Sequence, residues 1–336
     1  MLQSRRGFLA QAGAAVTIGT VPPRLPARIS EKEGPSPQAI LSLFKSLPGD
    51  VAIKIHAPAS NNKPAFLVES NPSKVMFVGS AIKTFVLCEA LRQVDSPDLV
   101  QTLTANQLAL DAGVWSLDSA TFNPPNLIGK VSERTALEAM ILHSDNTGTD
   151  MCLKHVGPDK VREFIASIGL KNTMIPDSTR SLFGHLLGAK NYKTFSWEEL
   201  GAAANLQIVN SPLNKIETMA STADEFVDYY SRALQGEFFK NKQTLHEFRR
   251  ILAMGDAIWL LPLPLGVSAF VKGGSIDVAR FHALCAPGAM LFDERWVYFC
   301  IAINWYAEAV TDPNTAEAFA AATSRALTLV KEGLSA

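Results

Sequence analysis

Charged residues are scarce in this chain of 336 residues, and no block of like charge interrupts it. Only 19% of the residues are charged, and the formal net charge is −1. A nucleic-acid or anionic-membrane partner needs a concentrated basic surface, which this composition does not supply. No apolar run reaches the roughly 18 residues that a transmembrane helix needs. Hydrophobic residues nevertheless make up 47% of the chain, enough for a sizeable core in one large domain or in two closely packed lobes.

Cysteine and histidine are also sparse. The four cysteines form no C-x-x-C pair and lie mostly in apolar stretches, which predicts buried thiols rather than a disulfide framework. The six histidines include no H-E-x-x-H motif, and Cys152-x-x-His155 has no second half. We therefore expect no metal site and no other cofactor.

The N-terminus carries a twin-arginine pattern. Arg5-Arg6 precedes a mildly apolar stretch rich in alanine and glycine, Ala10 to Val21. This predicts a signal segment over residues 1–27, with cleavage after Ala27, followed by a linker over residues 28–37. Such signals address folded chains to a dedicated export machinery, so we expect a periplasmic or secreted protein. An ordinary basic N-terminus is the alternative.

The spacing of apolar residues changes along the chain. Alternation predicts strands near both ends, and helical spacing predicts helices between them. The predicted strands are 50–57, 66–69, 268–272, 279–284 and 296–305, with turns at Pro287-Gly288 and Asp293-Glu294. The predicted helices are 38–47, 80–94, 132–143, 147–156, 160–168, 223–234 and 315–331.

This order of elements predicts an α/β (α+β) fold. One antiparallel sheet is built from both chain ends, flanked by helices, and an all-helical lobe is inserted between them. A single domain over residues 38–336 would hold a sheet lobe of residues 38–75 and 220–336 and a helical lobe of residues 76–219. We expect a small ligand to bind in a cleft between the lobes.

Two segments match S-x-x-K, a spacing that puts serine and lysine on one face of a helix. Serine becomes a good nucleophile only when a partner takes its proton. Ser80 follows the extended stretch 74–78 and opens an apolar helix, where free N–H groups lie. Ser42 and Lys45 lie inside a short helix, and we interpret them as its solvated face. We predict that Ser80 is the nucleophile and that Lys83 helps to deprotonate it.

A second tripeptide, Ser144-Asp145-Asn146, lies between two predicted helices. Ser144 can pass a proton to a leaving nitrogen, and Asn146 can hold a substrate amide or Lys83. Asp145 can fix the loop through backbone hydrogen bonds. The alternative is an ordinary loop in which Asp145 only caps the next helix.

A third tripeptide, Lys272-Gly273-Gly274, closes a predicted strand. Glycine lets a ligand approach the backbone closely. Lys272 adds a second cation, and like charge favours the neutral amine of Lys83. Taken alone, the tripeptide could equally be a flexible strand end with a surface lysine.

In this order the three motifs resemble those of the serine β-lactamase and penicillin-binding superfamily, and most of all those of the class A β-lactamases. The resemblance covers roughly residues 38–332. It implies acylation at Ser80, a proton relay through Ser144, and an oxyanion hole made by the N–H groups of Ser80 and Ser275. Trp115 would be an aromatic wall, although a large aromatic can equally be core. The substrate-binding residues that the resemblance implies are Asn146, Lys272, Gly274 and Trp115.

Two features depart from the family pattern. Gly273 stands where the family has Thr or Ser, whose hydroxyl helps to bind the carboxylate of a β-lactam; Arg280 or Ser275 could compensate. Class A enzymes also need a glutamate on a loop after the central helices, which activates the water that frees the acyl-enzyme. The corresponding stretch, 172–180, holds Asp177 as its only acid.

The segment 169–219 is longer than its family counterpart and holds two further acids of interest. Ser196-x-x-Glu199 reads as a capping box, which leaves Glu198 as the freer carboxylate. The deacylating base could be Asp177, Glu198, Glu199 or none of them. A general base contributes ~10²–10⁴-fold in rate, so an acyl-enzyme without one should persist.

Hydrolysis of a small β-lactam through a Ser80 ester is the expected function. An esterase or a peptidase-like acyl-transfer enzyme is the first alternative. A non-catalytic protein that binds β-lactams or cell-wall fragments is the second, and the intact set of reactive residues speaks against it.

Overall fold

The computed structural model describes residues 36–60, 63–203, 207–255, 257 and 261–335. The predicted signal segment and all but the last two residues of the predicted linker lie outside these residues. Within them, no helix combines the length and the apolar composition that a membrane crossing requires.

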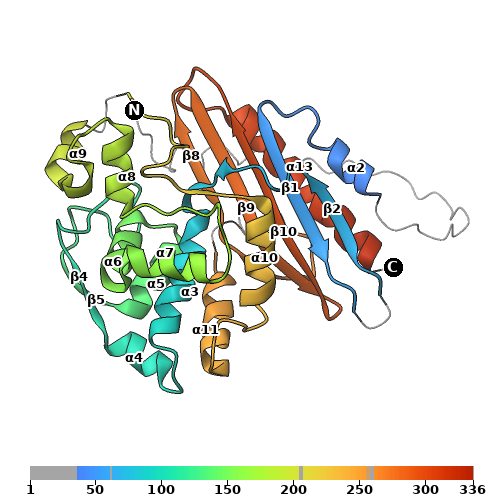
Figure 1. Ribbon diagram of the computed structural model, residues 1–336, viewed down its shortest axis with the longest axis horizontal. Helices are drawn as coiled ribbons and strands as arrows, with labels where there is room; N and C mark the ends of the chain where they lie inside the picture. The colour runs from blue at the N-terminus through green and yellow to red at the C-terminus, as the bar shows by residue number, and fades with distance from the viewer. Residues whose placement is uncertain (1–35, 61–62, 204–206, 256, 258–260, 336) are drawn as a thin grey trace, which may run out of the picture.

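A six-stranded antiparallel sheet is built from both ends of the chain, as Figure 1 shows by the blue and orange strands that lie side by side. The order is β2-β1-β10-β9-β7, and β8 pairs with the same strand, β9, as β7 does. This arrangement confirms the predicted fold class. The strands are β1 Asp50–Ala57, β2 Phe66–Ser70, β7 Ser268–Val271, β8 Gly274–Val278, β9 Phe281–Phe292 and β10 Arg295–Trp305.

Helices and two short strand pairs make up the rest of the described chain. The strand pairs are β3 Met76–Phe77 with β6 Ala220–Ser221, and β4 Gln107–Leu110 with β5 Gly129–Ser132. The 3₁₀ turns are η1 Gly79–Ile82 and η2 Tyr192–Thr194. The α-helices are α2 Pro37–Ser42, α3 Lys83–Gln93, α4 Leu99–Ala105, α5 Glu133–Leu142, α6 Asn146–Val156, α7 Pro158–Ser167, α8 Thr179–Leu186, α9 Trp197–Ala203, α10 Ala223–Ala233, α11 Lys242–Leu252 and α13 Pro313–Leu334.

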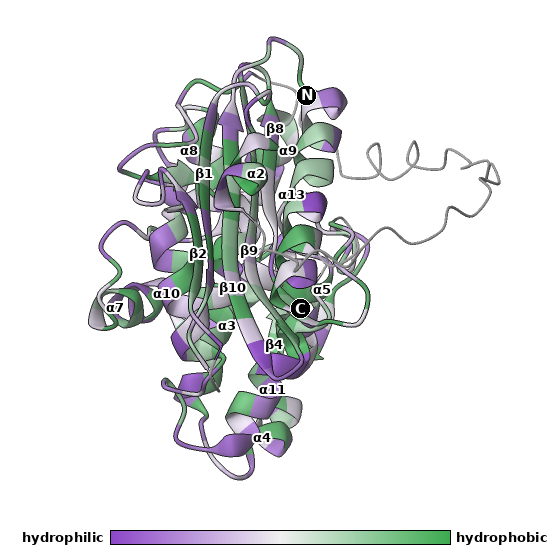
Figure 2. Ribbon diagram, turned by 90° about the vertical axis from the view of Figure 1, so that its right-hand side faces the viewer, coloured by the Kyte–Doolittle hydropathy of each residue, from purple (hydrophilic) through white to green (hydrophobic). Residues whose placement is uncertain are grey.

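The sheet has helices on both faces. α10 packs against β1, β9 and β10 on one face, and α13 covers the other, where Phe319 shares a core cluster with Ile301. Successive residues of a strand point to opposite faces, so Cys300 and Ala302 belong to the cluster on the α10 side instead. Figure 2 shows β9 and β10 in mostly apolar colours, with hydrophilic residues at the turn that joins them. Burial on both faces explains their continuous apolar sequence.

Several predicted boundaries are wrong. The first helix ends at Ser42 instead of residue 47. Pro287-Gly288 is not a turn but lies inside β9, and the predicted strand 279–284 instead contains the reversal from β8 into β9. β9 pairs with β8 over residues 281–285 and with β7 over residues 288–291. Pro287 lies between these two pairings, where its missing N–H interrupts neither ladder.

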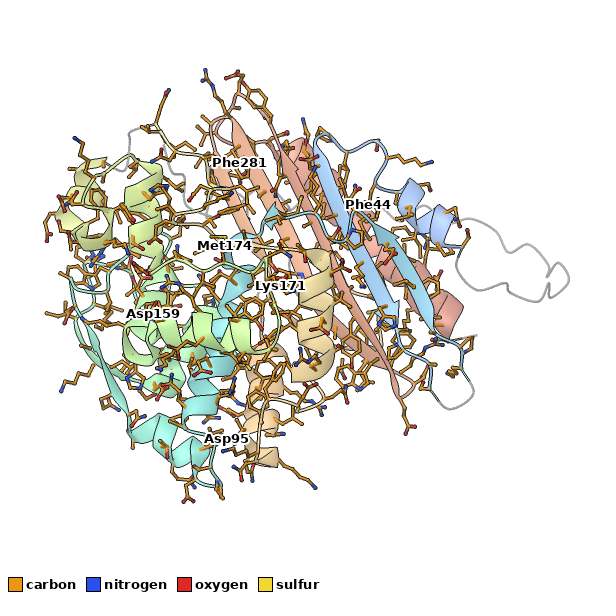
Figure 3. All side chains as sticks on the ribbon, viewed as in Figure 1. Phe44, Asp95, Asp159, Lys171, Met174 and Phe281 are labelled. Carbon is orange, nitrogen blue, oxygen red and sulfur yellow. The ribbon has the colours of Figure 1, made fainter. Side chains whose placement is uncertain are left out.

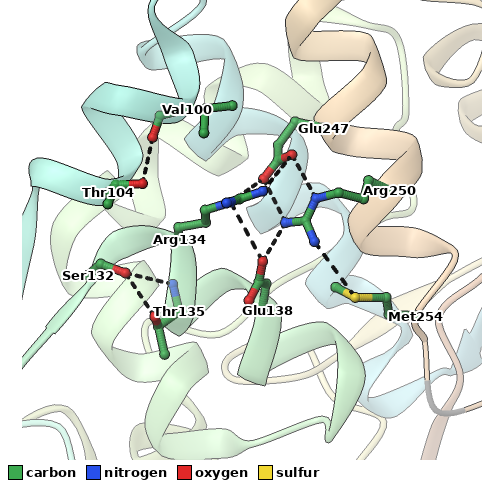
Figure 4. A network of polar contacts seen from close by, with 9 residues as sticks. All are labelled: Val100, Thr104, Ser132, Arg134, Thr135, Glu138, Glu247, Arg250 and Met254. Carbon is green, nitrogen blue, oxygen red and sulfur yellow. Dashed lines mark hydrogen bonds and ion pairs between the residues drawn. The ribbon is translucent and has the colours of Figure 1, made fainter.

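A buried carboxylate joins α11 to α5 (Figure 4). Glu247 accepts from Arg134 Nε at 2.8 Å and from Arg250 Nη2 at 2.7 Å, and Arg250 also donates to Glu138. Burial opposes the ionisation of Glu247, but the two arginines outweigh it and lower its pKa. Charge-assisted bonds of this kind are among the stronger ones in proteins. They fix α11, whose C-terminal end leads toward the third motif.

Candidate active site

Ser80 lies in the 3₁₀ turn η1, which runs directly into α3 at Lys83. The predicted helix 80–94 therefore begins as a tighter turn. The preceding backbone is held by the bond from Val78 N to Met219 O, at 2.8 Å. Gly79 has a φ of +53°, a conformation that glycine adopts at little cost. The side chain of Ser80 is only 8% exposed. Its position is set by the held backbone before it and by α3 after it.

The buried amine of Lys83 joins the first motif to the second. Lys83 is fully buried, and its Nζ donates to Ser144 O at 2.7 Å and to Asn146 Oδ1 at 2.7 Å. The Ser144 hydroxyl oxygen lies 3.3 Å from the same Nζ. A buried ammonium is stable only with several such oxygen partners. The geometry brings together three residues that the sequence singled out, Lys83, Ser144 and Asn146, and Ser80 lies in the turn that leads directly into Lys83.

Asp145 fixes the loop that presents Ser144. Ser144 has a φ of +52°, which costs a non-glycine residue of order 1–3 kcal/mol and needs support from its surroundings. The Asp145 carboxylate supplies that support by accepting from Thr121 N at 2.8 Å and Phe122 N at 3.1 Å. It also caps α6 through Gly148 N, at 2.8 Å. These bonds match the backbone-fixing role that we expected of Asp145.

Gly274 packs directly against the backbone of η1. A Cβ at Gly274 would lie 2.0 Å from Val78 O and 2.8 Å from Ser80 N, and one at Gly79 would lie 2.8 Å from Ser275 N. Only glycine at both positions allows so close an approach. The N–H groups of Ser80 and Ser275 are thus on backbone segments in direct contact, as two donors to one oxyanion must be.

At Gly273 the third motif is covered by a neighbouring side chain. A Cβ at Gly273 would lie 2.9 Å from the Cβ of Ala257, so Ala257 already fills the space that a Thr or Ser side chain would enter. Lys272 is fully buried, and its Nζ donates to Gly273 O at 2.7 Å. The segment after α11 also packs closely against the end of β7, because a Cβ at Gly255 would lie 1.9 Å from Val271 O.

Arg280 does not compensate for the missing hydroxyl. It lies in the turn between β8 and β9, is 73% exposed, and pairs with Glu308 at 3.3 Å. The five residues of β8 separate it from Gly273, about 17 Å of extended chain.

Trp115 is half-buried and borders the second motif. Its ring meets that of Trp197 on α9 edge to face, with centroids 5.9 Å apart, and it also packs against the main core cluster. Asn146 Nδ2 donates to Leu117 O at 2.9 Å. The Arg180 guanidinium donates to Trp115 O at 3.3 Å and to two further carbonyls of the same loop. Contacts from α6, α8 and α9 therefore fix the loop that carries Trp115.

Thr179 is the residue by which the stretch 172–180 contacts the second motif. Its N–H donates to Asp150 Oδ1 at 2.6 Å, and its hydroxyl donates to Ser116 Oγ at 2.8 Å. The same hydroxyl lies 3.5 Å from Asn146 O. Burial raises the pKa of Asp150 to about 6, although it accepts backbone N–H bonds from this loop. A neutral hydroxyl thus stands at the contact of this stretch with the second motif.

Asp177 is engaged in ion pairs. It lies 2.5 Å from Arg162 Nη2 and 3.2 Å from Lys193 Nζ. Burial opposes its ionisation, but these two cations outweigh it and lower its pKa. The carboxylate therefore helps to join α7, η2 and the loop.

Glu199 caps α9, as predicted. Its Oε2 accepts from Ser196 N at 2.7 Å, and Ser196 Oγ accepts from Glu199 N at 3.1 Å. These bonds lower the pKa of Glu199. Both Glu198 and Glu199 are exposed on the helix surface.

Glu217 is a buried carboxyl that the sequence did not reveal. It is 2% exposed and accepts from Asp177 N at 3.1 Å and Ser181 Oγ at 3.2 Å. Burial raises its pKa. It lies beside Met219 and Ala220, which bond to Val78 and Met174, and Figure 3 places Met174 at the boundary between the helices and the sheet. Its partners lie far away in the sequence, so no local pattern could indicate its role.

The family and the fold agree with this geometry. A model of the β-lactamase enzyme family matches residues 37–281, and the chain belongs to that family. The TLA-3 extended-spectrum β-lactamase is similar over 87% of this chain and 98% of its own, with 18% identity and a TM-score of 0.66. Comparison with curated proteins gives no match.

Two other solved structures share the fold. A class A β-lactamase from Bacteroides cellulosilyticus is 20% identical, with a TM-score of 0.63, over 87% of this chain and 96% of its own. A mutant of PBP-A, solved as an acyl-enzyme with penicillin G, is 16% identical, with a TM-score of 0.62, over 88% and 96%.

Proposed function

We propose that this protein is a serine enzyme that opens β-lactams by forming an acyl-enzyme through Ser80, and that it releases the product slowly. The buried amine of Lys83, held by Ser144 and Asn146 one helical turn from Ser80, is the observation that carries the proposal. A lysine placed in this way serves a serine that must lose its proton. The contact between Gly274 and the Ser80 backbone supports an oxyanion hole beside it.

Acylation follows from these positions. Lys83, in its neutral form, takes the proton of Ser80, and the Ser80 oxygen bonds to the lactam carbonyl carbon. The carbonyl electrons move to the oxygen, where the N–H groups of Ser80 and Ser275 stabilise the charge; one such donor contributes ~3–4 kcal/mol. As the carbonyl re-forms, the C–N bond breaks. The Ser144 hydroxyl gives its proton to the nitrogen and regains one from Lys83.

Among the described residues, none of the acids that the sequence singled out is placed as a free base for deacylation. Asp177 and Glu199 are committed to other contacts, Glu198 is exposed on α9, and Thr179 contributes a hydroxyl. A missing general base slows hydrolysis by ~10²–10⁴-fold. We therefore expect the Ser80 ester to accumulate.

Esters and peptide-like acyl donors are a second class of substrate. Ala257 occupies the space beside Gly273, and Lys272 is fully buried. Recognition of a substrate carboxylate at the third motif is therefore weaker than in the family pattern. Substrates without that carboxylate fit this feature better.

The test combines a chromogenic cephalosporin assay with intact-protein mass measurement. A stable adduct at stoichiometric amount with slow turnover is the expected result, and Ser80→Ala should abolish it. Ser42→Ala, in the other S-x-x-K match, is the matched control and should behave as the wild type. Rapid turnover without an adduct would contradict slow release, and an absence of adduct with both lactams and esters would leave a binding protein.

We also propose export by the twin-arginine route into the periplasm or beyond. The support is the sequence of residues 1–27, with Arg5-Arg6 ahead of an apolar stretch. Arg5→Lys together with Arg6→Lys should leave the protein in the cytoplasm, as measured by fractionation. Export unchanged by this double substitution would refute the route.

A further inference from the structure

Three side chains form a row across β8, β9 and β10. Asp277 is opposite His282 in one strand pair, and His282 is opposite Trp305 in the next. The imidazole of His282 stacks on the Trp305 indole, with centroids 5.1 Å apart and planes inclined by 24°. His282 is fully buried. A buried imidazole needs hydrogen-bond partners for both ring nitrogens.

Both nitrogens of His282 face acceptors. Nδ1 lies 2.9 Å from Asp277 Oδ1, and Nε2 lies 3.3 Å from Ala307 O. An ionised carboxylate and a carbonyl oxygen only accept, whereas neutral imidazole carries a single N–H. The doubly protonated imidazolium therefore satisfies both bonds together, and a neutral ring loses one of them. The Trp305 ring beneath it favours the same cation.

The surrounding charges also favour the imidazolium. Asp277 faces it from β8, and Asp312 lies beyond Trp305, whose Nε1 donates to it at 3.0 Å. At the rim, Arg280 and Glu308 pair with each other, and the Tyr306 hydroxyl bonds to Glu308.

The balance of these effects raises the pKa of His282. Burial alone would lower it below the ordinary value of 6.5. The hydrogen bond and charge of Asp277 outweigh burial, with help from the carbonyls of Ala307 and Ala309, and move the pKa above that value. The imidazolium is thus kept to a higher pH than in an unperturbed histidine, and it is lost as the pH rises through the raised pKa.

β8 is the strand that depends on this contact. It has five residues, and its ladder partner among the described strands is β9 alone. Asp277 lies two residues after Ser275, about 7 Å along an extended chain. A side-chain bond that holds one end of so short an edge strand also restricts where its other end lies.

We propose that His282 is a positioning residue for acylation: its doubly protonated ring holds β8, and with it the Ser275 N–H, against η1. The proposal rests on the proposed acyl-enzyme function. When the ring loses one proton, either the bond to Asp277 or the bond to Ala307 goes, and the ring no longer joins β8 to the loop before α13. The oxyanion donor then lies less well placed for the transition state, which lowers the acylation rate and leaves Lys83 unaffected.

The test measures the acylation rate constant with a chromogenic cephalosporin from about pH 6 to about pH 9. The rate ratio of wild type to His282→Gln is expected to be roughly tenfold at the acidic end, because small misplacements of reacting groups cost rate steeply. It should fall toward one at the alkaline end. Asp277→Asn should move this fall to lower pH, since it removes the charge that holds the second proton. His246→Gln, at an exposed position on α11, is the matched control and should give a ratio near one throughout.

A ratio that does not change with pH would overturn the proposal. So would a nitrogen-15 titration of the wild-type imidazole in which the His282 ring loses its second proton below the ordinary pKa of 6.5, a measurement that needs no variant and no substrate. Absence of any adduct in the wild type, by contrast, refutes the proposed function itself and the positioning role with it. An adduct in the wild type with a flat ratio refutes the role of His282 alone.

Discussion

Lys83 and Lys272 are both fully buried, but they lie in different surroundings. The Lys83 amine is held by oxygens of the Ser144-Asp145-Asn146 loop, whereas Lys272 donates to the carbonyl of the next residue, Gly273. The first region keeps the polar set of its family. In the second, packing against Ala257 takes the place of a hydroxyl. Under the proposed function, the comparison teaches that the machinery for acylation and the recognition of a substrate carboxylate can change separately.

Of the two regions, the one around Lys83 should be the less tolerant of substitution. Lys83→Ala removes the proposed proton acceptor of Ser80 and leaves two buried oxygens without their donor. We expect acylation to fall by more than ~10³-fold, with a stability loss of about 1–3 kcal/mol for an unsatisfied buried group. Stopped-flow acylation of folded protein checks this. Lys45→Ala, in the other S-x-x-K match, should retain full activity; a comparable loss there would contradict the assignment.

A carboxylate at position 179 should supply the general base for deacylation that the stretch 172–180 lacks. Thr179→Glu places an acid at the contact with the second motif, and general-base help is worth ~10²–10⁴-fold. We expect the deacylation rate to rise by about 10²-fold, followed as loss of adduct mass. Thr179→Gln has the same size without the base and should remain slow. Equal deacylation rates in the two variants would show that residue 179 does not lie beside the water that attacks the acyl-enzyme.

The same contact should make stability depend on pH. The pKa of Asp150 is about 6 in the folded protein against an ordinary 3.8, so the unfolded chain releases this proton first as the pH rises. The free energy of unfolding therefore decreases between about pH 4 and pH 6, by up to ~3 kcal/mol from this group. Asp150→Asn cannot ionise and keeps an oxygen for Thr179 N–H. Urea unfolding across this range should show a flatter profile in the variant; parallel profiles would refute the assignment.

The Gly273 region should show the smallest effect. Gly273→Thr forces a side chain against Ala257, and overpacking of this kind costs ~1–3 kcal/mol. Ala257→Gly in the same chain should recover part of that loss, because the two positions are in contact. Thermal unfolding of the single and double variants measures the coupling. Additive losses would show that Ala257 does not occupy this space.

Much of the fold could be predicted because local signals agreed with the tertiary structure. Alternation gave β1 its observed bounds, 50–57, and Ser132 caps α5 through Thr135 N as its type and place suggest. The prediction was wrong at Pro287-Gly288, since residues that usually make turns lie inside β9. Their strand conformation depends on how β7 and β8 share an edge, which no window of the sequence contains.

The site divides in the same way. Ser80, Lys83, Ser144 and Asn146 come from two motifs with fixed spacing, and the structure joins the two motifs through the bonds of Lys83 to Ser144 and Asn146. Ala257 and Glu217 carried no such signal, because each acts through residues distant in sequence, and His282 bonds to Ala307 across 25 positions. Thr179 was inside the expected stretch, but only its contact with Asp150 shows where it lies.

β1 lies inside the sheet between β2 and β10, and β10 is among the last elements to be synthesised. A chain still short of residue 295 therefore exposes the apolar residues of β1 and cannot complete the ladder that covers them. Folding of the sheet waits for synthesis to finish, as expected where pairing joins distant segments. Deletion of the C-terminal strands should accordingly yield aggregates rather than a smaller stable protein.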